Sequence, residues 1–228
     1  AVFLVRLAAL IAIRRVFALK NVRVFFEKTG KMKFISHLDM NRFFTRILRR
    51  SKLPVWYTEG FHPHPYIAFA LPLSLGFESC YEVLDFKVED DEISFEEIMK
   101  SLEAVVPSGI KIKTVAEPLK KSGKISFAGF DVIFENDDTA SAFFDYLKGG
   151  NVVVSKKTKK GQIKIEEISE KIVSVSLNEN TVSLILPAGN DNINPTLLVT
   201  SFCEKTETEV IPQYIRTAIY DEEKKLFR

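Results

Sequence analysis

The period of hydrophobic and polar positions changes several times along this chain from residue 22 onward. Two-residue alternation and short apolar runs predict strands, whereas recurrence at three and four residues predicts helices. In the first half the predicted strands are residues 22–28, 67–71, 81–88 and 110–115. Ser36 and Ser94 are N-cap residues for helices that should end near Ser51 and Val106. The resulting order, βαββαβ, is that of a ferredoxin-like fold.

The second half repeats this order with an addition. A strand at residues 127–134 precedes a helix that Asp138 should cap and Gly149 should end. Two hairpins follow at residues 152–168 and 172–186, then a helix opened by Asn194 and Pro195, with Pro195 in its first position, and a strand at residues 210–219. We therefore predict an α+β protein of two tandem ferredoxin-like halves, residues 21–120 and 125–228, the second with an extra β-hairpin.

The first twenty residues carry a different pattern. Residues 7–13 form an unbroken apolar run flanked by Arg6, Arg14 and Arg15. The run is too short to span a bilayer, and no small-x-small cleavage site follows it. We expect residues 1–20 to be an N-terminal extension or linker. The alternative is an amphipathic helix lying at a membrane surface.

Composition limits the chemistry of the chain. Of 228 residues, 46% are hydrophobic and 27% are charged, which excludes wholesale disorder, and the net charge is only +2. Cys80 and Cys203 are far apart, so the chain supplies neither a zinc ribbon nor a three-cysteine iron–sulfur cradle. Unpaired thiols favour a reducing compartment, and we expect a cytoplasmic protein without membrane attachment.

Basic residues gather in the first predicted helix. At about 100° per residue, its apolar face points one way and four arginines point the other, namely Arg42, Arg46, Arg49 and Arg50. Like charges on one stripe repel one another unless anions lie close, and guanidinium forks fit phosphate oxygens. The alternative is a solvated helix face balanced by acidic loops such as residues 89–92. A Lys-rich hairpin tip at residues 156–161 could extend an anion-binding surface.

All three histidines lie in the same stretch. His37 stands at the helix start, and His62 and His64 belong to residues 60–65, Gly-Phe-His-Pro-His-Pro. Each proline fixes its own φ and restricts the residue before it, so this loop should be stiff. It suits stacking of Phe61 and His64 on a base, although a structural connector is the alternative.

Catalysis and metal binding place further demands on these residues. His37 or His64 could act as a general acid or base in RNA cleavage, and Asp39 is a further catalytic candidate. A metal would need the three histidines and Asp39 to converge, and we predict no metal site. Residues 68–76 read as a buried strand followed by a structural turn. Glu78 and Glu82 are candidates to neutralise the helix arginines.

Taken together, these segments resemble one family. Residues 28–39, 46–50, 53–54, 60–65 and 70–76 strongly resemble the bacterial radical SAM-linked proteins, a domain family of unknown function (DUF2344), and the resemblance extends over about residues 22–115. Its motif positions here are Ser36, His37, Asp39, Arg49, Arg50, Gly60, Phe61, Pro63, His64, Pro65, Pro72 and Gly76. His62 departs from the asparagine expected at that position.

The resemblance implies a companion or fusion partner, a radical SAM protein that supplies SAM and the iron–sulfur cluster. We therefore expect an accessory binding module that positions structured RNA or another phosphate-bearing substrate and is not catalytic by itself. The expected contacts are Ser36, His37, Arg42, Arg46, Arg49, Arg50, Gly60, Phe61, Pro63, His64, Pro65 and Gly76. The alternatives are a metal-independent RNA-processing enzyme and a docking domain for the radical SAM partner.

Overall fold

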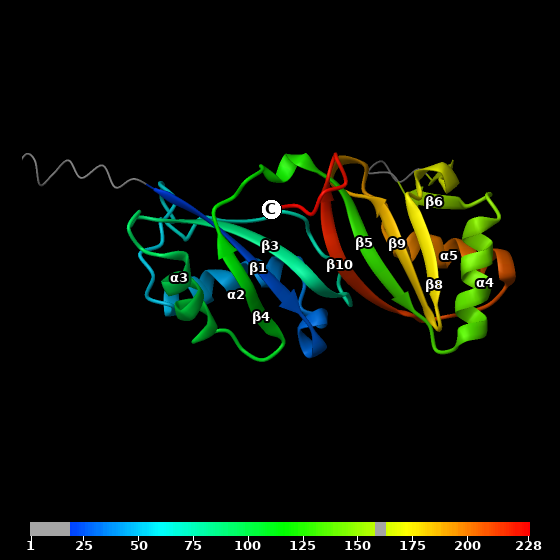
Figure 1. Cartoon of the computed structure of the whole chain (residues 1–228), viewed down its shortest axis with the longest axis horizontal. Helices are drawn as coiled ribbons and strands as arrows, with labels where there is room; N and C mark the ends of the chain where they lie inside the picture. The colour runs from blue at the N-terminus through cyan, green and yellow to red at the C-terminus, as the bar shows by residue number, and fades with distance from the viewer. Residues whose placement is uncertain (1–18, 158–162) are drawn as a thin grey trace, which may run out of the picture.

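A computed structural model describes residues 19–157 and 163–228 (Figure 1). Most of the predicted N-terminal extension, residues 1–20, and the centre of the Lys-rich hairpin tip lie outside the described residues. The predictions for those two segments are therefore not tested by the structure.

The first half contains four strands and two α-helices. In chain order they are β1 (Lys20–Lys28), α2 (His37–Arg50), β2 (Ile67–Phe69), β3 (Glu78–Val88), α3 (Phe95–Glu103) and β4 (Ile110–Ala116). A 3₁₀ turn, η1 (Gly30–Phe34), precedes α2. Strand β1 lies between β4 and β3, and β2 pairs with the other edge of β3. All of these pairings are antiparallel.

The second half contains six strands and two α-helices. They are β5 (Ile125–Ile133), α4 (Asp137–Lys148), β6 (Val153–Lys157), β7 (Ile163–Glu167), β8 (Ser174–Asn178), β9 (Thr181–Pro187), α5 (Pro195–Thr206) and β10 (Gln213–Asp221). Short 3₁₀ turns lie directly before β5, at η2 (Ser122–Lys124), after β7, at η3 (Ser169–Lys171), and after β9, at η4 (Gly189–Asp191). The strand order is β10-β5-β9-β8, and the β6–β7 hairpin forms a separate two-stranded sheet.

The two halves share one sheet. Strand β10 pairs in parallel with β3, where Ile215 lies opposite Glu78 and Arg216 lies opposite Ser79. This short ladder joins the halves into an eight-stranded, mainly antiparallel sheet. Figure 1 shows α2 and α3 beside the first half of the sheet and α4 and α5 beside the second. The predicted α+β class is confirmed.

Each half has its own hydrophobic core. In the first, Phe44 and Leu48 of α2 and Ile98 of α3 pack on buried residues of β1, β3 and β4. In the second, Phe143 of α4 and Phe202 of α5 pack against the sheet and touch each other edge to face, with ring centroids 5.4 Å apart. The helices therefore follow from their apolar stripes, as the sequence pattern indicates.

Several predicted boundaries are confirmed and others are wrong. Ser36, Ser94 and Asn194 cap α2, α3 and α5, and Ser94 with Glu97 forms a complete capping box. However, Asn136, not Asp138, caps α4, because its extended backbone lets its side chain accept from the Thr139 amide. Strand β2 ends at Phe69 rather than residue 71. Strand β10 begins at Gln213, directly after Pro212, which has no N–H to donate to a ladder.

A buried ion pair lies at the seam between the halves. Arg216 of β10 is 1% exposed and donates from Nε to Glu82 Oε1 at 2.9 Å. Its other nitrogens donate to the backbone oxygens of Leu71 and Pro72. These contacts agree with the predicted structural turn after β2, whereas the strand itself, predicted to be buried, is only partly buried. Arg216 therefore ties this turn and β3 to the second half.

The pairing of Glu82 with Arg216 corrects one prediction. Glu82 and Glu78 do not neutralise the arginines of α2. Glu82 is 3% exposed and is paired with Arg216, and Glu78 lies 3.4 Å from Lys33. The short parallel contact between β3 and β10 brings Arg216 to Glu82, and such long-range pairing cannot be predicted from local sequence spacing.

A candidate anion-binding groove

Helix α2 presents its polar face to solvent because its other face is buried. Met40, Phe44 and Ile47 are buried in the first core. At the helix start, the Ser36 hydroxyl accepts from the Asp39 amide at 3.2 Å and donates to Asp39 Oδ2 at 2.8 Å. Arg42 donates to the same carboxylate at 3.0 Å. The Ser36 hydrogen bond, followed by the Arg42 hydrogen bond, lowers the pKa of Asp39.

The four arginines of α2 are all exposed. Among residues 19–157 and 163–228, only Arg42 of the four forms an ion pair, with Asp39. The guanidinium carbon of Arg49 lies 6.0 Å from the centre of the Tyr57 ring. Arg46 and Arg49 thus present positive charge to solvent without a carboxylate partner in the described part of the chain.

The loop between α2 and β2 folds back on itself, and hydrogen bonds join its two arms. The Thr58 amide donates to the His64 carbonyl at 2.9 Å, and the Tyr66 amide donates to the Trp56 carbonyl at 3.2 Å. These bonds close residues 59–63 into a tip. Gly60 lies there at φ +126°, a conformation that side chains disfavour. Pro63 and Pro65 stiffen the returning arm.

The side chain of His64 is oriented by its own loop. Its Nδ1 lies 3.0 Å from the His62 carbonyl oxygen and 3.2 Å from the Thr58 hydroxyl. A carbonyl oxygen only accepts hydrogen bonds, so the contact with His62 requires a proton on Nδ1. In the neutral ring, Nε2 then carries the lone pair, and in the protonated ring Nε2 is a second donor.

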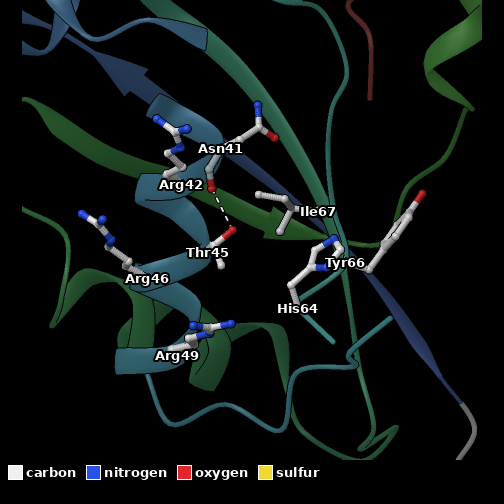
Figure 2. A pocket seen from close by; sticks show the side chains of 8 residues that line it. All are labelled: Asn41, Arg42, Thr45, Arg46, Arg49, His64, Tyr66 and Ile67. Atoms are coloured by element: carbon white, nitrogen blue, oxygen red, sulfur yellow. Dashed lines mark hydrogen bonds between the residues drawn. The ribbon is translucent and has the colours of Figure 1, made fainter. Parts of the chain in front are cut away.

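The helix arginines and the loop enclose a groove with a volume of about 620 Å³. Figure 2 shows Arg42, Arg46 and Arg49 along one side and His64, Tyr66 and Ile67 along the other. Asn41 and Thr45 line the helix side, where the Thr45 hydroxyl donates to the Asn41 carbonyl at 2.8 Å. The groove is therefore strongly cationic, with an imidazole and a phenol ring on the opposite wall.

The structure brings together four of the predicted contacts, Arg42, Arg46, Arg49 and His64. Arg50 is exposed on α2 but does not line the groove, and neither do Ser36, His37, Phe61 or Gly76.

Two of these residues have a different environment. The ring of His37 packs edge-on against Phe69, with centroids 5.2 Å apart, and its Nε2 lies 3.3 Å from the Asn41 amide nitrogen. Phe61 stands at the loop tip, fully exposed.

Four groove residues were not predicted, namely Asn41, Thr45, Tyr66 and Ile67. A signal for two of them was present in the sequence. Asn41, Thr45 and Arg49 recur at intervals of four, so they lie on one helix face. Tyr66 and Ile67 follow the last proline of the loop, and only the folding back of the loop brings them opposite α2.

The described residues contain neither a group of metal ligands nor a membrane-spanning helix. Among the described residues, no three His, Cys, Asp or Glu side chains are grouped to hold a metal ion. The thiols of Cys80 on β3 and Cys203 on α5 are free. In the same part of the chain, no helix has both the length and the apolar character needed to cross a bilayer.

Fold and groove together define an α+β protein with a preformed cationic surface site. The chain belongs to the family described as "Uncharacterized protein conserved in bacteria (DUF2344)", whose model matches residues 21–201. The predicted resemblance to DUF2344 is thereby confirmed, and every residue of the groove lies within the matched range. The chain has no match among curated proteins.

Proposed function

We propose that this chain is an accessory binding module that holds a phosphate-bearing substrate, RNA foremost, for a radical SAM protein. The observation that carries the proposal is the groove between α2 and the loop before β2. Three arginines of one helix face line it, and two of them, Arg46 and Arg49, form no ion pair among the described residues. Guanidinium forks fit phosphate oxygens with two hydrogen bonds at once.

The size and the walls of the groove support the same ligand. Its volume of about 620 Å³ lies within the common range for ligand sites, about 300–1,000 Å³. Tyr66 offers a ring for stacking, and His64 offers Nε2 as a hydrogen-bond partner. Cationic side chains interleaved with aromatic rings are the usual means of binding single-stranded nucleic acid.

The proposed partner, a radical SAM protein, follows from the family resemblance of residues 22–115. In this proposal the radical SAM protein supplies SAM and the iron–sulfur cluster, and the present chain positions the substrate in the cytoplasm. The free thiols Cys80 and Cys203 lie on different elements, which agrees with a cluster held by the partner. The module itself then needs no cofactor and performs no chemistry.

The sheet supports a ferredoxin-like interpretation of each half. In the first half the strands lie in the order β4-β1-β3 with β2 at the β3 edge, and in the second the order is β10-β5-β9-β8. Numbered within each half, and with the β6–β7 hairpin set aside, both orders run fourth, first, third, second. We infer a tandem repeat in which the hairpin is an insertion.

A binding assay tests the proposed function. Fluorescence anisotropy with labelled single-stranded RNA of about ten nucleotides should show salt-sensitive binding by the wild-type chain. The double variant Arg46→Ala/Arg49→Ala should bind at least about tenfold more weakly and lower the salt slope by about two. Lys148→Ala, an exposed cation on α4 in the other half, is the charge control. Equal affinities for the double variant and the control would refute the proposal.

One observation favours catalysis as a second candidate. His64 lies on the wall of a cationic groove, and its Nε2 has no hydrogen-bond partner among the described residues, which suits a general acid or base in RNA cleavage without metal. His37 is less suited, because its ring is packed against Phe69 and Asn41. Cleavage of RNA by the purified chain, abolished in His64→Gln, would support this candidate. Absence of any cleavage would remove it.

Another observation favours docking as a third candidate. Phe61 is fully exposed at the tip of the loop and does not line the groove. An exposed aromatic side chain on a stiff tip is suited to contact with a partner protein. Loss of co-purification with the radical SAM protein in Phe61→Ser, with RNA affinity unchanged, would assign the tip to docking.

A further inference from the structure

A second hollow adjoins the groove on the other side of Tyr66. Its volume is about 180 Å³, and it opens beside β1 and β3 and the segment that links the two halves. Its charged lining residues are Arg23, Asp85, Lys87, Glu117, Lys120 and Lys121. Tyr66 lines both sites, so its ring forms part of the boundary between them.

The hollow contains more cations than carboxylates. Asp85 is bound by Arg23 through two hydrogen bonds of 2.7 Å, and Lys120 pairs with Asp221 at 2.5 Å. The remaining cations are Lys87 and Lys121, and neither forms an ion pair within the described ranges. Glu117 is the one lining carboxylate left to oppose them. The hollow is therefore suited to an anion.

The lysine at the rim is held next to the groove. The Lys87 ammonium lies 5.3 Å from the centre of the Trp56 ring and 5.6 Å from the centre of the Tyr66 ring. Trp56 and Tyr66 in turn touch each other, with centroids 5.8 Å apart. A cation and two rings thus form one contiguous surface between the two hollows.

Arg23 provides an independent observation. It is completely buried, with its guanidinium stacked on Phe227 at 4.6 Å. Asp85 accepts from Nε and Nη2, but Nη1 has no partner, and it is the one buried side-chain nitrogen or oxygen of the described residues in that condition. A buried donor without a protein partner costs free energy, and an acceptor bound at this nitrogen would reduce that cost.

We propose that the ligand of the groove passes around Tyr66 and places a second phosphate in this hollow, near Lys87, Lys121 and Arg23. This inference rests on the proposed function and narrows its substrate class. A single phosphate cannot occupy both sites, so a mononucleotide or a singly phosphorylated peptide would use only the groove. The ligand is a strand with repeated phosphates and bases, namely single-stranded RNA, with a base stacked on Tyr66.

A length series tests the inference. Two labelled RNA ligands are compared, a single nucleotide, whose one phosphate cannot occupy both sites, and a single strand of about ten nucleotides, which reaches both sites. Lys87→Ala/Lys121→Ala should weaken the longer RNA about tenfold and the shorter one less than about twofold. Arg46→Ala/Arg49→Ala should weaken both RNAs. Lys148→Ala should weaken neither, and thermal melting of each variant verifies its fold.

The possible outcomes separate the two proposals. An unchanged affinity of Lys87→Ala/Lys121→Ala for the longer RNA overturns the second site and leaves the groove intact. Equal losses for both RNAs also overturn it, because the lysines would then act on the groove itself. If the wild-type chain binds neither RNA above the level of the Arg46→Ala/Arg49→Ala variant, the proposed function fails and the inference fails with it.

Discussion

Arginine occupies two contrasting environments in this protein. On α2, Arg46 and Arg49 are exposed and have no carboxylate partner among the described residues. In the sheet, Arg23 and Arg216 are 0% and 1% exposed, and each is bound to one carboxylate, Asp85 or Glu82. The first pair faces solvent, where a ligand can reach it, whereas the second pair joins strands of the sheet, although Nη1 of Arg23 has no partner among the described residues.

The contrast shows why total charge says little about this chain. A net charge of +2 does not reveal that Arg46 and Arg49 are exposed without an ion pair among the described residues, whereas Arg23 and Arg216 are buried and paired. Removing one member of a buried pair leaves an uncompensated charge and destabilises the fold, whereas removing an exposed, unpaired cation changes stability little. Stability and binding should therefore respond to different arginines.

The largest expected effect is on the buried pair at the seam. Arg216→Met leaves Glu82 buried without its partner and frees the carbonyls of Leu71 and Pro72. The free energy of unfolding should fall by about 3–5 kcal/mol, measured by urea denaturation. The double variant Arg216→Met/Glu82→Leu, which removes both charges, should recover part of the loss. A loss below about 1 kcal/mol in Arg216→Met would contradict the assignment.

A second comparison lies within α2 itself. Arg46 lines the groove, whereas Arg50 is exposed on the same helix but outside it. Arg46→Ala should weaken RNA binding about tenfold and Arg50→Ala less than about twofold, as determined by anisotropy at one salt concentration. The free energy of unfolding should change by less than about 0.5 kcal/mol in both. Equal losses of affinity would mean that general helix charge, rather than the groove, attracts the ligand.

A smaller effect is expected at the start of α2. Ser36→Ala removes the hydroxyl that accepts from the Asp39 amide and donates to its carboxylate. The free energy of unfolding should fall by about 1 kcal/mol, while Ser36→Thr, which retains a hydroxyl, should lose less. RNA affinity of the folded Ser36→Ala protein should remain within about twofold of wild type. A large loss of affinity without a loss of stability would instead place Ser36 in the binding site.

The smallest effect is a change in pH dependence at Lys28. Lys28 is buried, and this burial lowers its pKa from the ordinary value of 10.5, although Glu82 opposes the shift. Between the lowered pKa and 10.5, the unfolded chain holds this proton and the folded chain has released it. The contribution of Lys28 to the free energy of unfolding therefore rises with pH in that window.

Lys28→Met isolates this contribution. The free energy of unfolding of wild type minus that of the variant should increase as pH rises through the alkaline range below 10.5. Urea denaturation at several pH values gives this difference directly. A difference that is constant, or that falls with pH, would contradict the lowered pKa.

Local sequence predicted the elements better than their long-range partners. The helices follow from apolar stripes and side-chain caps, and Ser36, Ser94 and Asn194 marked their starts correctly. The partner of Glu82 could not be predicted in the same way. It depends on a contact between β3 and β10, strands more than a hundred residues apart in the chain.

Local sequence also predicted only part of the candidate site. Helical spacing placed Arg42, Arg46 and Arg49 on one face, and the prolines indicated a stiff loop beside His64. The spacing did not separate Arg50 from the other arginines, nor did it bring Tyr66 opposite the helix. Those features depend on how the loop returns to β2, through the hydrogen bonds of Thr58 and Tyr66 with the facing strand of the loop.

Crosslinking with residue-level mapping tests the central claim most directly. The wild-type chain would be irradiated in complex with single-stranded RNA that carries photoreactive uridines, and the crosslinked peptides would be identified by mass spectrometry. The groove predicts crosslinks in residues 41–67, with Tyr66 foremost, and their loss in Arg46→Ala/Arg49→Ala. Crosslinks confined to residues 125–228, or unchanged in that variant, would contradict it.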